Sequence, residues 1–593
     1  MSSRRRACQA CHVLKARCDP SEGDAGICER CWRLDKECVP APRKLQRDRI
    51  AELEAQVEQL TKLLQSHGVS DTPSTTADVK KRKLSDGSPK EAKTESSPTL
   101  VPSKDVLDYI DNQVSRAQQR QALDAYQKRI MRVSPYIQNA DMDLDKLRKT
   151  PLLLLSILAF PNTGVLSSDL QHDMAERAIS DFQAKMIAAG ERNLELVQSL
   201  LISVFWFRAR PGFKHATIMQ LSHLAVGMAA DLGIGGPQAS YDPGVAFDRM
   251  EGAYSLEARR IWLSCFIASS GMTTILRRPD SNPWTYYHND SLNAIRTYSS
   301  RLEDRLFCQI VHAEEICQRI TTRLELADIT RFWDLSDPSI EVIFSQLRLA
   351  IDDWAAKIPQ DLRRPELMFY QQIALIYLNE PVLHTQFNKS TFCPPLLPEK
   401  MTPSDFACPT VTVNHVAALY ALKDACHEAL NIATTLPVTT VLSTSSLCYS
   451  PRILYALFML LKLHIAVTAH SNTYGIILSN TELYTEYYLE KVIALSDALA
   501  VTDAGTHKSF VTQILQASTK LAQWFQSYNT KILEKNLEKD ANAAQYDAFL
   551  ATTSGAVDAM ALPAEMDLGA AKFFEDEYML NSLFAEEIVP LPP

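Results

Sequence analysis

Six cysteines within the first 38 residues constrain this chain more than any other feature of its sequence. They form the pattern C-x2-C-x6-C twice, so that each cysteine of the first triplet has a counterpart twenty residues later. The N-terminus lacks the apolar segment of a secretory signal, and clustered cysteines in such a chain favour metal binding over disulfides. The six are Cys8, Cys11, Cys18, Cys28, Cys31 and Cys38.

The number of cysteines predicts the number of metal ions. A structural zinc ion takes four ligands, so two ions need eight, and six cysteines supply eight only if two sulfur atoms bridge both ions. The internal repeat points to the first member of each triplet. One ion would then be held by Cys8, Cys11, Cys18 and Cys28, and the other by Cys8, Cys28, Cys31 and Cys38. The alternative is a single zinc ribbon made of Cys8, Cys11, Cys28 and Cys31, which takes up one ion per chain.

The rest of the chain has the composition of a helical protein. Glycine accounts for 18 of 593 residues, about 3% where about 7% is usual, which disfavours glycine-rich phosphate loops and β folds with many turns. From residue 105 to 535, apolar residues recur at spacings of three and four, which predicts a large all-α body. A clear example ends at Gly233 and consists of Ile218, Leu221, Ala225, Met228 and Leu232.

The sequence predicts neither a membrane span nor an enzyme. The longest apolar stretch, Ile453 to Thr468, is interrupted by Lys462 and His464 and is shorter than the ~20 residues that cross a bilayer, so we expect a buried helix. The nearest match to a phosphate loop, residues 233–236, follows a predicted helix instead of a strand. Zinc sites saturated by cysteine also leave no open position for catalysis.

A short linker, residues 41–49, separates the cysteine module from an apolar heptad pattern. Residues 50–66 contain neither glycine nor proline, and their apolar positions are spaced three and four apart, as in a parallel two-stranded coiled coil. An amphipathic helix packed on the body is the alternative. The predicted dimerisation residues are Ile50, Leu53, Val57, Leu60 and Leu64.

The net charge of −9 is unevenly distributed along the chain. Residues 1–50 carry 12 Lys/Arg against 7 Asp/Glu, whereas residues 541–593 carry 9 acidic residues against Lys572 alone. Residues 67–104 are rich in Ser, Thr, Pro and Lys, and we expect them to form a flexible tether that contains a nuclear localisation signal at Lys80, Lys81, Arg82 and Lys83.

The acidic C-terminal region, residues 540–593, interleaves acids with large apolar side chains. This composition is typical of activation regions that bind transcriptional coactivators, although a C-terminal helix docked on the body is the alternative. The apolar residues are Phe573, Phe574, Tyr578, Leu580, Leu583 and Phe584.

The cysteine spacing, linker and short coiled coil together resemble the fungal Zn2Cys6 binuclear-cluster transcription factors. The segments 225–233 and 257–262, with Arg277-Arg278-Pro279 after them, resemble the middle homology region common in that family. The resemblance implies two zinc ions per chain, a module of residues 1–40 that binds double-stranded DNA, and a location in the nucleus.

The resemblance also implies roles for basic residues near the first cysteine triplet. Lys15 stands where family members contact the bases of a guanine pair. Phosphate contacts would come from Arg17, His12, Arg4, Arg5, Arg6, Arg43, Lys44 and Arg47. In the second triplet the positions equivalent to Lys15 and Arg17 are Asp35 and Glu37, so the first helix is the one expected to approach DNA. His12, Leu14 and Ile27 depart from the family pattern.

The sequence therefore predicts a sequence-specific, non-enzymatic regulator of transcription that binds CGG-type half-sites as a homodimer and activates a gene set. A repressor, or a regulator gated by a small-molecule effector held in the helical body, is the alternative of the same class. A zinc-containing scaffold that binds protein instead of DNA is the alternative from another class.

Overall fold

The structure is a computed structural model of the whole chain. It describes residues 8, 11, 18, 28–34, 38–39, 103–138, 142–208, 216–236, 252, 254–386, 388–393, 411–469 and 473–552, with side chains up to residue 532. The chain divides into two compact units, residues 1–95 and 96–593, and each is described by itself. The regular elements found in the described residues are helices, which confirms the prediction of a mostly α protein.

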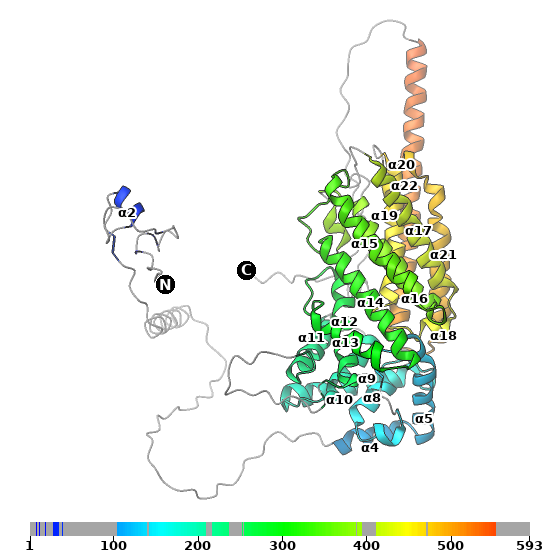
Figure 1. Cartoon of the computed structure of the whole chain (residues 1–593). Coiled ribbons are helices and arrows are strands. Elements are labelled where there is room, and N and C mark those ends of the chain that lie inside the picture. Colours follow the sequence, from blue (N-terminus) through cyan, green and yellow to red (C-terminus); the bar gives the residue numbers. More distant parts are fainter. Residues whose placement is uncertain are drawn as a thin grey trace, which may run out of the picture. The chain divides into compact units, whose positions relative to one another are not determined.

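The first half of the larger unit consists of mostly short helices at one end of the body (Figure 1). Pro151 opens α8, whose nine residues are all buried, because a proline at the first helical position loses no hydrogen bond. Gly233, with φ +74°, follows α11, whose predicted apolar positions are buried. The elements are α4 (Ser103–Gln113), α5 (Arg116–Ala125), η1 (Tyr126–Ile130), α6 (Met131–Val133), α7 (Leu144–Leu147), α8 (Pro151–Ala159), α9 (Ser168–Phe182), η2 (Gln183–Ala188), α10 (Leu194–Phe205) and α11 (Ala216–Asp231).

The second half is a bundle of longer helices that run side by side (Figure 1). Its elements are α12 (Leu256–Leu276), α13 (Tyr286–Tyr298), α14 (Leu302–Arg323), α15 (Pro338–Lys357), η3 (Gln360–Leu362), α16 (Pro365–Asn379), η4 (Glu380–Leu383), η5 (Lys389–Phe392), α17 (Val413–Thr435), α18 (Val438–Val441), α19 (Ser450–Thr468), α20 (Tyr474–Ile477), η8 (Asn480–Leu483), α21 (Thr485–Thr502) and α22 (Phe510–Thr552).

Helix α19 forms the centre of this bundle. Every side chain from Ser450 to Val467 is buried, and the helix packs against α16, α17, α21 and α22. By length and composition it is the one described helix that could cross a membrane, yet 94% of its apolar window is buried inside the body. The prediction of a buried helix at this position is confirmed.

The last helix differs from the boundaries expected from sequence. Helix α22 continues to Thr552, past the expected end of the body at 535 and into the segment assigned to the acidic tail from 540. Residues 536–552 lack glycine and proline and contain five alanines, so their helix propensity is high. The sequence prediction instead placed residues from 540 onward in the acidic tail. The first glycine after the helix is Gly555.

The predicted coiled coil, localisation signal and activation residues lie outside the described residues. These are Ile50, Leu53, Val57, Leu60 and Leu64, then Lys80 to Lys83, and finally Phe573, Phe574, Tyr578, Leu580, Leu583 and Phe584.

Candidate metal centre

The sulfur atoms of the N-terminal cysteines gather at one point. Four cysteines of the module, Cys8, Cys11, Cys28 and Cys31, are buried, and Cys18 and Cys38 pack against them. The sulfur atoms of Cys8, Cys11, Cys18 and Cys28 all lie within 4.8 Å of one another. Those of Cys8, Cys28, Cys31 and Cys38 do the same. Cys8 and Cys28 belong to both groups, and these are the two ligand sets that the sequence repeat predicts.

The two triplets fold in the same way locally. The backbone N–H of Cys8 donates to Sγ of Cys18 over 3.3 Å, and the N–H of Cys28 donates to Sγ of Cys38 over the same distance. Helix α2 (Glu29–Arg33) begins directly after Cys28. The sulfur of Cys28 accepts from the N–H of Cys31 over 3.4 Å and so takes the place of the oxygen that usually caps a helix.

The distances between sulfur atoms fit zinc. With Zn–S bonds of about 2.3 Å and tetrahedral angles, ligand sulfurs lie about 3.8 Å apart. The distances from Sγ of Cys8 to those of Cys28 and Cys31 are 3.8 and 3.6 Å, and Sγ of Cys11 lies 3.7 Å from that of Cys28. A soft, all-thiolate donor set of this geometry suits zinc. Six sulfurs, two of which are shared, provide the eight ligand positions that two ions need.

Hydrogen bonds from the backbone favour the thiolate at the two shared positions. The N–H of Cys11 lowers the pKa of the Cys8 thiol to about 6, and the N–H of Cys31 lowers the pKa of the Cys28 thiol. Burial raises the pKa of the Cys11 thiol. Because the thiolate is the form that binds metal, these backbone hydrogen bonds favour ligation by the two shared sulfurs.

The residues predicted to contact DNA lie outside the described residues: Lys15, Arg17, His12, Arg4, Arg5, Arg6, Arg43, Lys44 and Arg47. The structure therefore describes the six cysteines of the module, and the assignment of base and phosphate contacts stays a prediction.

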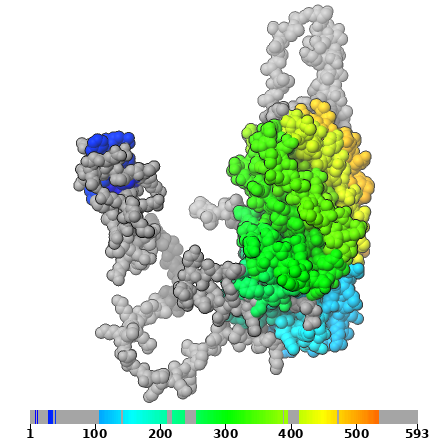
Figure 2. All heavy atoms as spheres, viewed as in Figure 1, coloured from blue at the N-terminus to red at the C-terminus, as the bar shows by residue number. Residues whose placement is uncertain are grey.

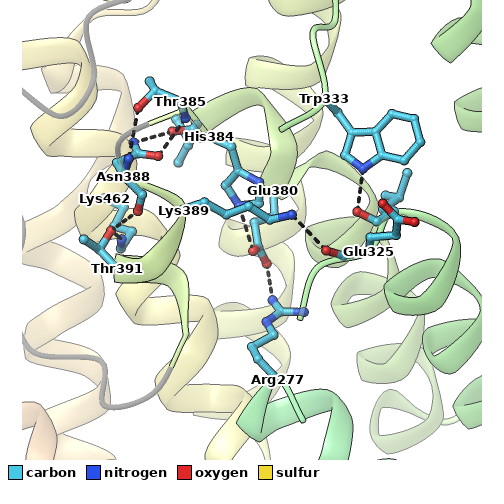
Figure 3. Close-up of polar contacts among 12 residues, drawn as sticks. Arg277, Glu325, Trp333, Glu380, His384, Thr385, Asn388, Lys389, Thr391 and Lys462 are labelled. Carbon is cyan, nitrogen blue, oxygen red and sulfur yellow. Dashed lines mark hydrogen bonds and ion pairs between the residues drawn. The ribbon is translucent and has the colours of Figure 1, made fainter. Parts of the chain in front are cut away.

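A second cluster of charged side chains lies inside the helical body (Figure 3). Arg277 caps the C-terminal end of α12 in the left-handed conformation, with φ +53°, and its guanidinium donates to the carboxylate of Glu380 at the start of η4. Tyr455 of α19 donates to the same carboxylate, and Nε2 of His384 lies 3.0 Å from its other oxygen. All four side chains are buried.

Electrostatics in this cluster favour the ionised carboxylate. Burial raises the pKa of Glu380, but the Arg277 guanidinium and the hydrogen bond from His384 outweigh burial and hold the pKa at about 2. Burial lowers the pKa of His384. Because Arg277, Glu380 and Tyr455 come from α12, η4 and α19, the cluster joins three segments of the body, and both carboxylate oxygens already have partners.

Two neighbouring ammonium groups complete the polar region shown in Figure 3. Nζ of Lys389 donates to the backbone carbonyl oxygens of Glu325 and Arg331 beyond the C-terminal end of α14. Nζ of Lys462, on the central helix, donates to Oγ1 of Thr391 over 2.6 Å. These contacts hold the turn at η5 against α14 and α19.

Sequence reasoning singled out Arg277 as part of a family-like segment but missed its partners. Glu380 stands in the run from Ile373 to Leu383, which is otherwise nearly all apolar. A carboxylate in such a run signals a buried charge that needs a partner. Which arginine pairs with it was not deducible, because Arg277 is 103 residues away.

Comparisons with known proteins cover both units. The family described as "WAR1 C-terminal domain" matches residues 76–570, and the "Fungal Zn(2)-Cys(6) binuclear cluster domain" matches residues 6–48. The chain is 25% identical to "Transcription factor pbcR" of Emericella nidulans over 393 residues, which cover 59% of this chain and 52% of that protein. It is 24% identical to "Transcription factor opdL" of Penicillium oxalicum over 337 residues, which cover 53% of this chain and 56% of that protein.

The chain therefore spans about half the length of these curated relatives. No solved structure matches it.

Proposed function

The chain belongs to the fungal Zn2Cys6 transcription factors that carry a WAR1 C-terminal domain, and from this premise we propose that it is a dimeric, sequence-specific activator of a gene set. The family's cluster domain binds two zinc ions. The observation that carries the proposal is the pair of sulfur groups that share Cys8 and Cys28. Two zinc ions bound there crosslink a module too small to form an apolar core.

DNA recognition is assigned to the first triplet. The segment from Cys8 to Cys18 carries Lys15 and Arg17 and no acidic residue, whereas the segment from Cys28 to Cys38 carries three basic and three acidic residues. A lysine ammonium suits the O6 and N7 acceptors of guanine in the major groove, which supports a CGG-type half-site. Arg17, His12, the arm at Arg4 to Arg6 and the linker at Arg43, Lys44 and Arg47 would contact phosphates.

The other parts of the proposal are dimerisation, nuclear import and activation, and each rests on a later segment of the chain. The heptad pattern at residues 50–64 supports a parallel dimer, so that two modules reach two half-sites. The basic run at residues 80–83 supports import into the nucleus. The acidic and aromatic residues between 573 and 584 support binding of coactivators.

Selection of binding sites from random DNA by the full chain tests the DNA function. We expect an enriched motif with paired CGG triplets, and we expect Lys15→Ala to weaken binding by about 1–3 kcal/mol and to relax selection at one position. Lys36→Ala, in the second triplet, is the matched control and should keep the motif. If no motif is enriched, or if Lys15→Ala behaves like the control, the assignment of DNA recognition is wrong and a protein-binding scaffold becomes the better interpretation.

A reporter gene under the selected motif separates activation from repression. Deleting residues 560–593 should remove most of the reporter signal while DNA binding persists. If the signal survives the deletion, the activation role of the tail is wrong. A full chain that lowers the reporter signal below the level measured without the protein instead indicates a repressor.

A further inference from the structure

Three large apolar side chains are exposed on the second half of the metal module. Trp32 is 65% exposed, Leu34 48% and Val39 43%. Trp32 and Val39 directly follow Cys31 and Cys38, whose sulfur atoms belong to the same ligand group and lie within 4.8 Å of each other. We name these three residues the Trp32 patch. Figure 2 shows the atoms of α2 at the surface of the N-terminal unit.

An exposed patch of this kind on a small module indicates a binding partner. Tryptophan is the residue most enriched among side chains that dominate protein interfaces, and isolated exposure of one apolar residue would need no explanation. Among the described residues of the module, the buried side chains are those of cysteines, and the three side chains of the patch are not part of that cluster.

DNA is the less suitable partner for this surface. Residues 28–39 carry Arg30, Arg33 and Lys36 against Glu29, Asp35 and Glu37, so their net charge is zero. The counterpart segment, residues 8–19, carries Lys15 and Arg17 against Asp19 alone. A surface without net charge gains little from phosphates, whereas it can approach an identical surface without electrostatic repulsion.

The charge order along α2 points to a second copy of this chain. The helix has an acidic residue at its first position, Glu29, and a basic residue at its last, Arg33, which are one turn apart. When two copies of α2 pack antiparallel across a two-fold axis, position 29 of each meets position 33 of the other, and Trp32 lies between them. This arrangement makes the surface complementary to itself, as a two-fold interface requires.

We propose that the Trp32 patch is the contact between the two metal modules of a DNA-bound dimer. Even fully covered on both copies, the three side chains would bury on the order of 600 Å², about half of the roughly 1,200 Å² that a stable interface needs. The contact is therefore too small to hold free modules together. It acts when the dimerisation helix and the DNA raise the effective concentration, and so it selects the half-site spacing that brings the two patches together.

The inference rests on the proposed function and is tested with zinc-loaded full chain on two kinds of DNA. One kind carries a single half-site, and the other carries two half-sites at a series of spacings. We expect Trp32→Ala to lower the affinity for the best paired spacing about tenfold and to leave single-site affinity within about twofold. Ile476→Ala, at a residue of the body that is 86% exposed, is the matched control and should change neither affinity.

A charge exchange tests the antiparallel geometry. Glu29→Arg and Arg33→Glu should each weaken paired-site binding, and the double variant should restore it, because each exchanged residue again meets an opposite charge. Each variant must bind two zinc ions per chain, which separates a lost contact from a lost fold.

Four results would overturn the inference. If Trp32→Ala weakens single-site binding by the same factor, the patch contacts DNA. If the spacing dependence is unchanged, or if the double charge exchange is no better than the single ones, the two copies do not meet at α2. A chain that selects no DNA motif would overturn the proposed function together with this inference, whereas normal selection with unchanged spacing dependence would overturn the inference alone.

Discussion

The pair of Arg277 and Glu380 allows a quantitative test of what holds the helical body together. The pKa of Glu380 is lowered from 4.5 to about 2, with burial acting against Arg277 and His384. This difference corresponds to about 3 kcal/mol of stabilisation of the ionised form on folding. Arg277→Met keeps the volume of the side chain but leaves a buried carboxylate without its cation, and such changes cost about 3–5 kcal/mol.

The same loss of unfolding free energy can be expressed as a decrease in melting temperature. A body of roughly 430 residues unfolds with an entropy of about 0.9 kcal/mol/K, so a loss of 3–5 kcal/mol lowers the melting temperature by about 3–6 °C. The assay is scanning calorimetry of the full chain, with Glu380→Gln and the double variant Arg277→Met/Glu380→Gln measured beside it. We expect the double variant to lose clearly less than the sum of the two single variants, because it contains no unpaired buried charge.

Two outcomes would refute this reasoning. A melting temperature of Arg277→Met within about 1 °C of the unmodified chain would mean that solvent or rearrangement compensates the carboxylate. Losses that simply add would mean that the two side chains do not act as a pair. In either case the contact between Arg277 and Glu380 would not itself be a source of stability.

The pH dependence has a definite sign. A carboxyl group whose pKa is lowered by folding stabilises the folded state above its unfolded pKa of 4.5, and this contribution is lost as the pH falls towards about 2. The unfolding free energy of the unmodified chain should exceed that of Glu380→Gln by about 3 kcal/mol at pH 7 and by about 2 kcal/mol at pH 3.5. Urea titrations at the two pH values measure it, and a difference that grows on acidification would contradict the assignment.

Further predictions concern the metal centre and two glycines. Cys28→Ser removes a ligand from both zinc groups, so the zinc released per chain in a chromophoric chelator assay should fall from two ions towards none, whereas Cys265→Ser, in the core of the body, should leave it at two. Gly236→Ala places a Cβ 2.8 Å from Cγ of Tyr287 at φ +109° and should destabilise the body by about 1–3 kcal/mol. Gly227→Ala, in α11 with no neighbour within 4 Å, should stabilise it by up to about 1 kcal/mol. Equal melting temperatures for the two alanine variants would contradict the described backbone.

The ends of two helices show which features of the fold the local sequence predicts. The apolar spacing from Ile218 to Leu232 and the glycine after it predicted both the buried face of α11 and its end, because helix periodicity and a glycine cap act within a few residues. The end of α22 lies beyond the boundary at 535 that the sequence predicts, because the alanine-containing segment after it continues the helix to Thr552.

The sequence by itself determined the metal chemistry of this protein. All six ligands lie within 31 residues, and their repeat predicts two ions and two shared sulfurs, because coordination number and chain spacing are local properties. Only the tertiary structure decided which buried charges meet. Arg277 pairs with Glu380 across 103 residues and Arg452 with Glu314 across 138, and no periodicity encodes such pairs. They follow from how α12, α14, α16 and α19 pack, which depends on the shapes of all their buried side chains together.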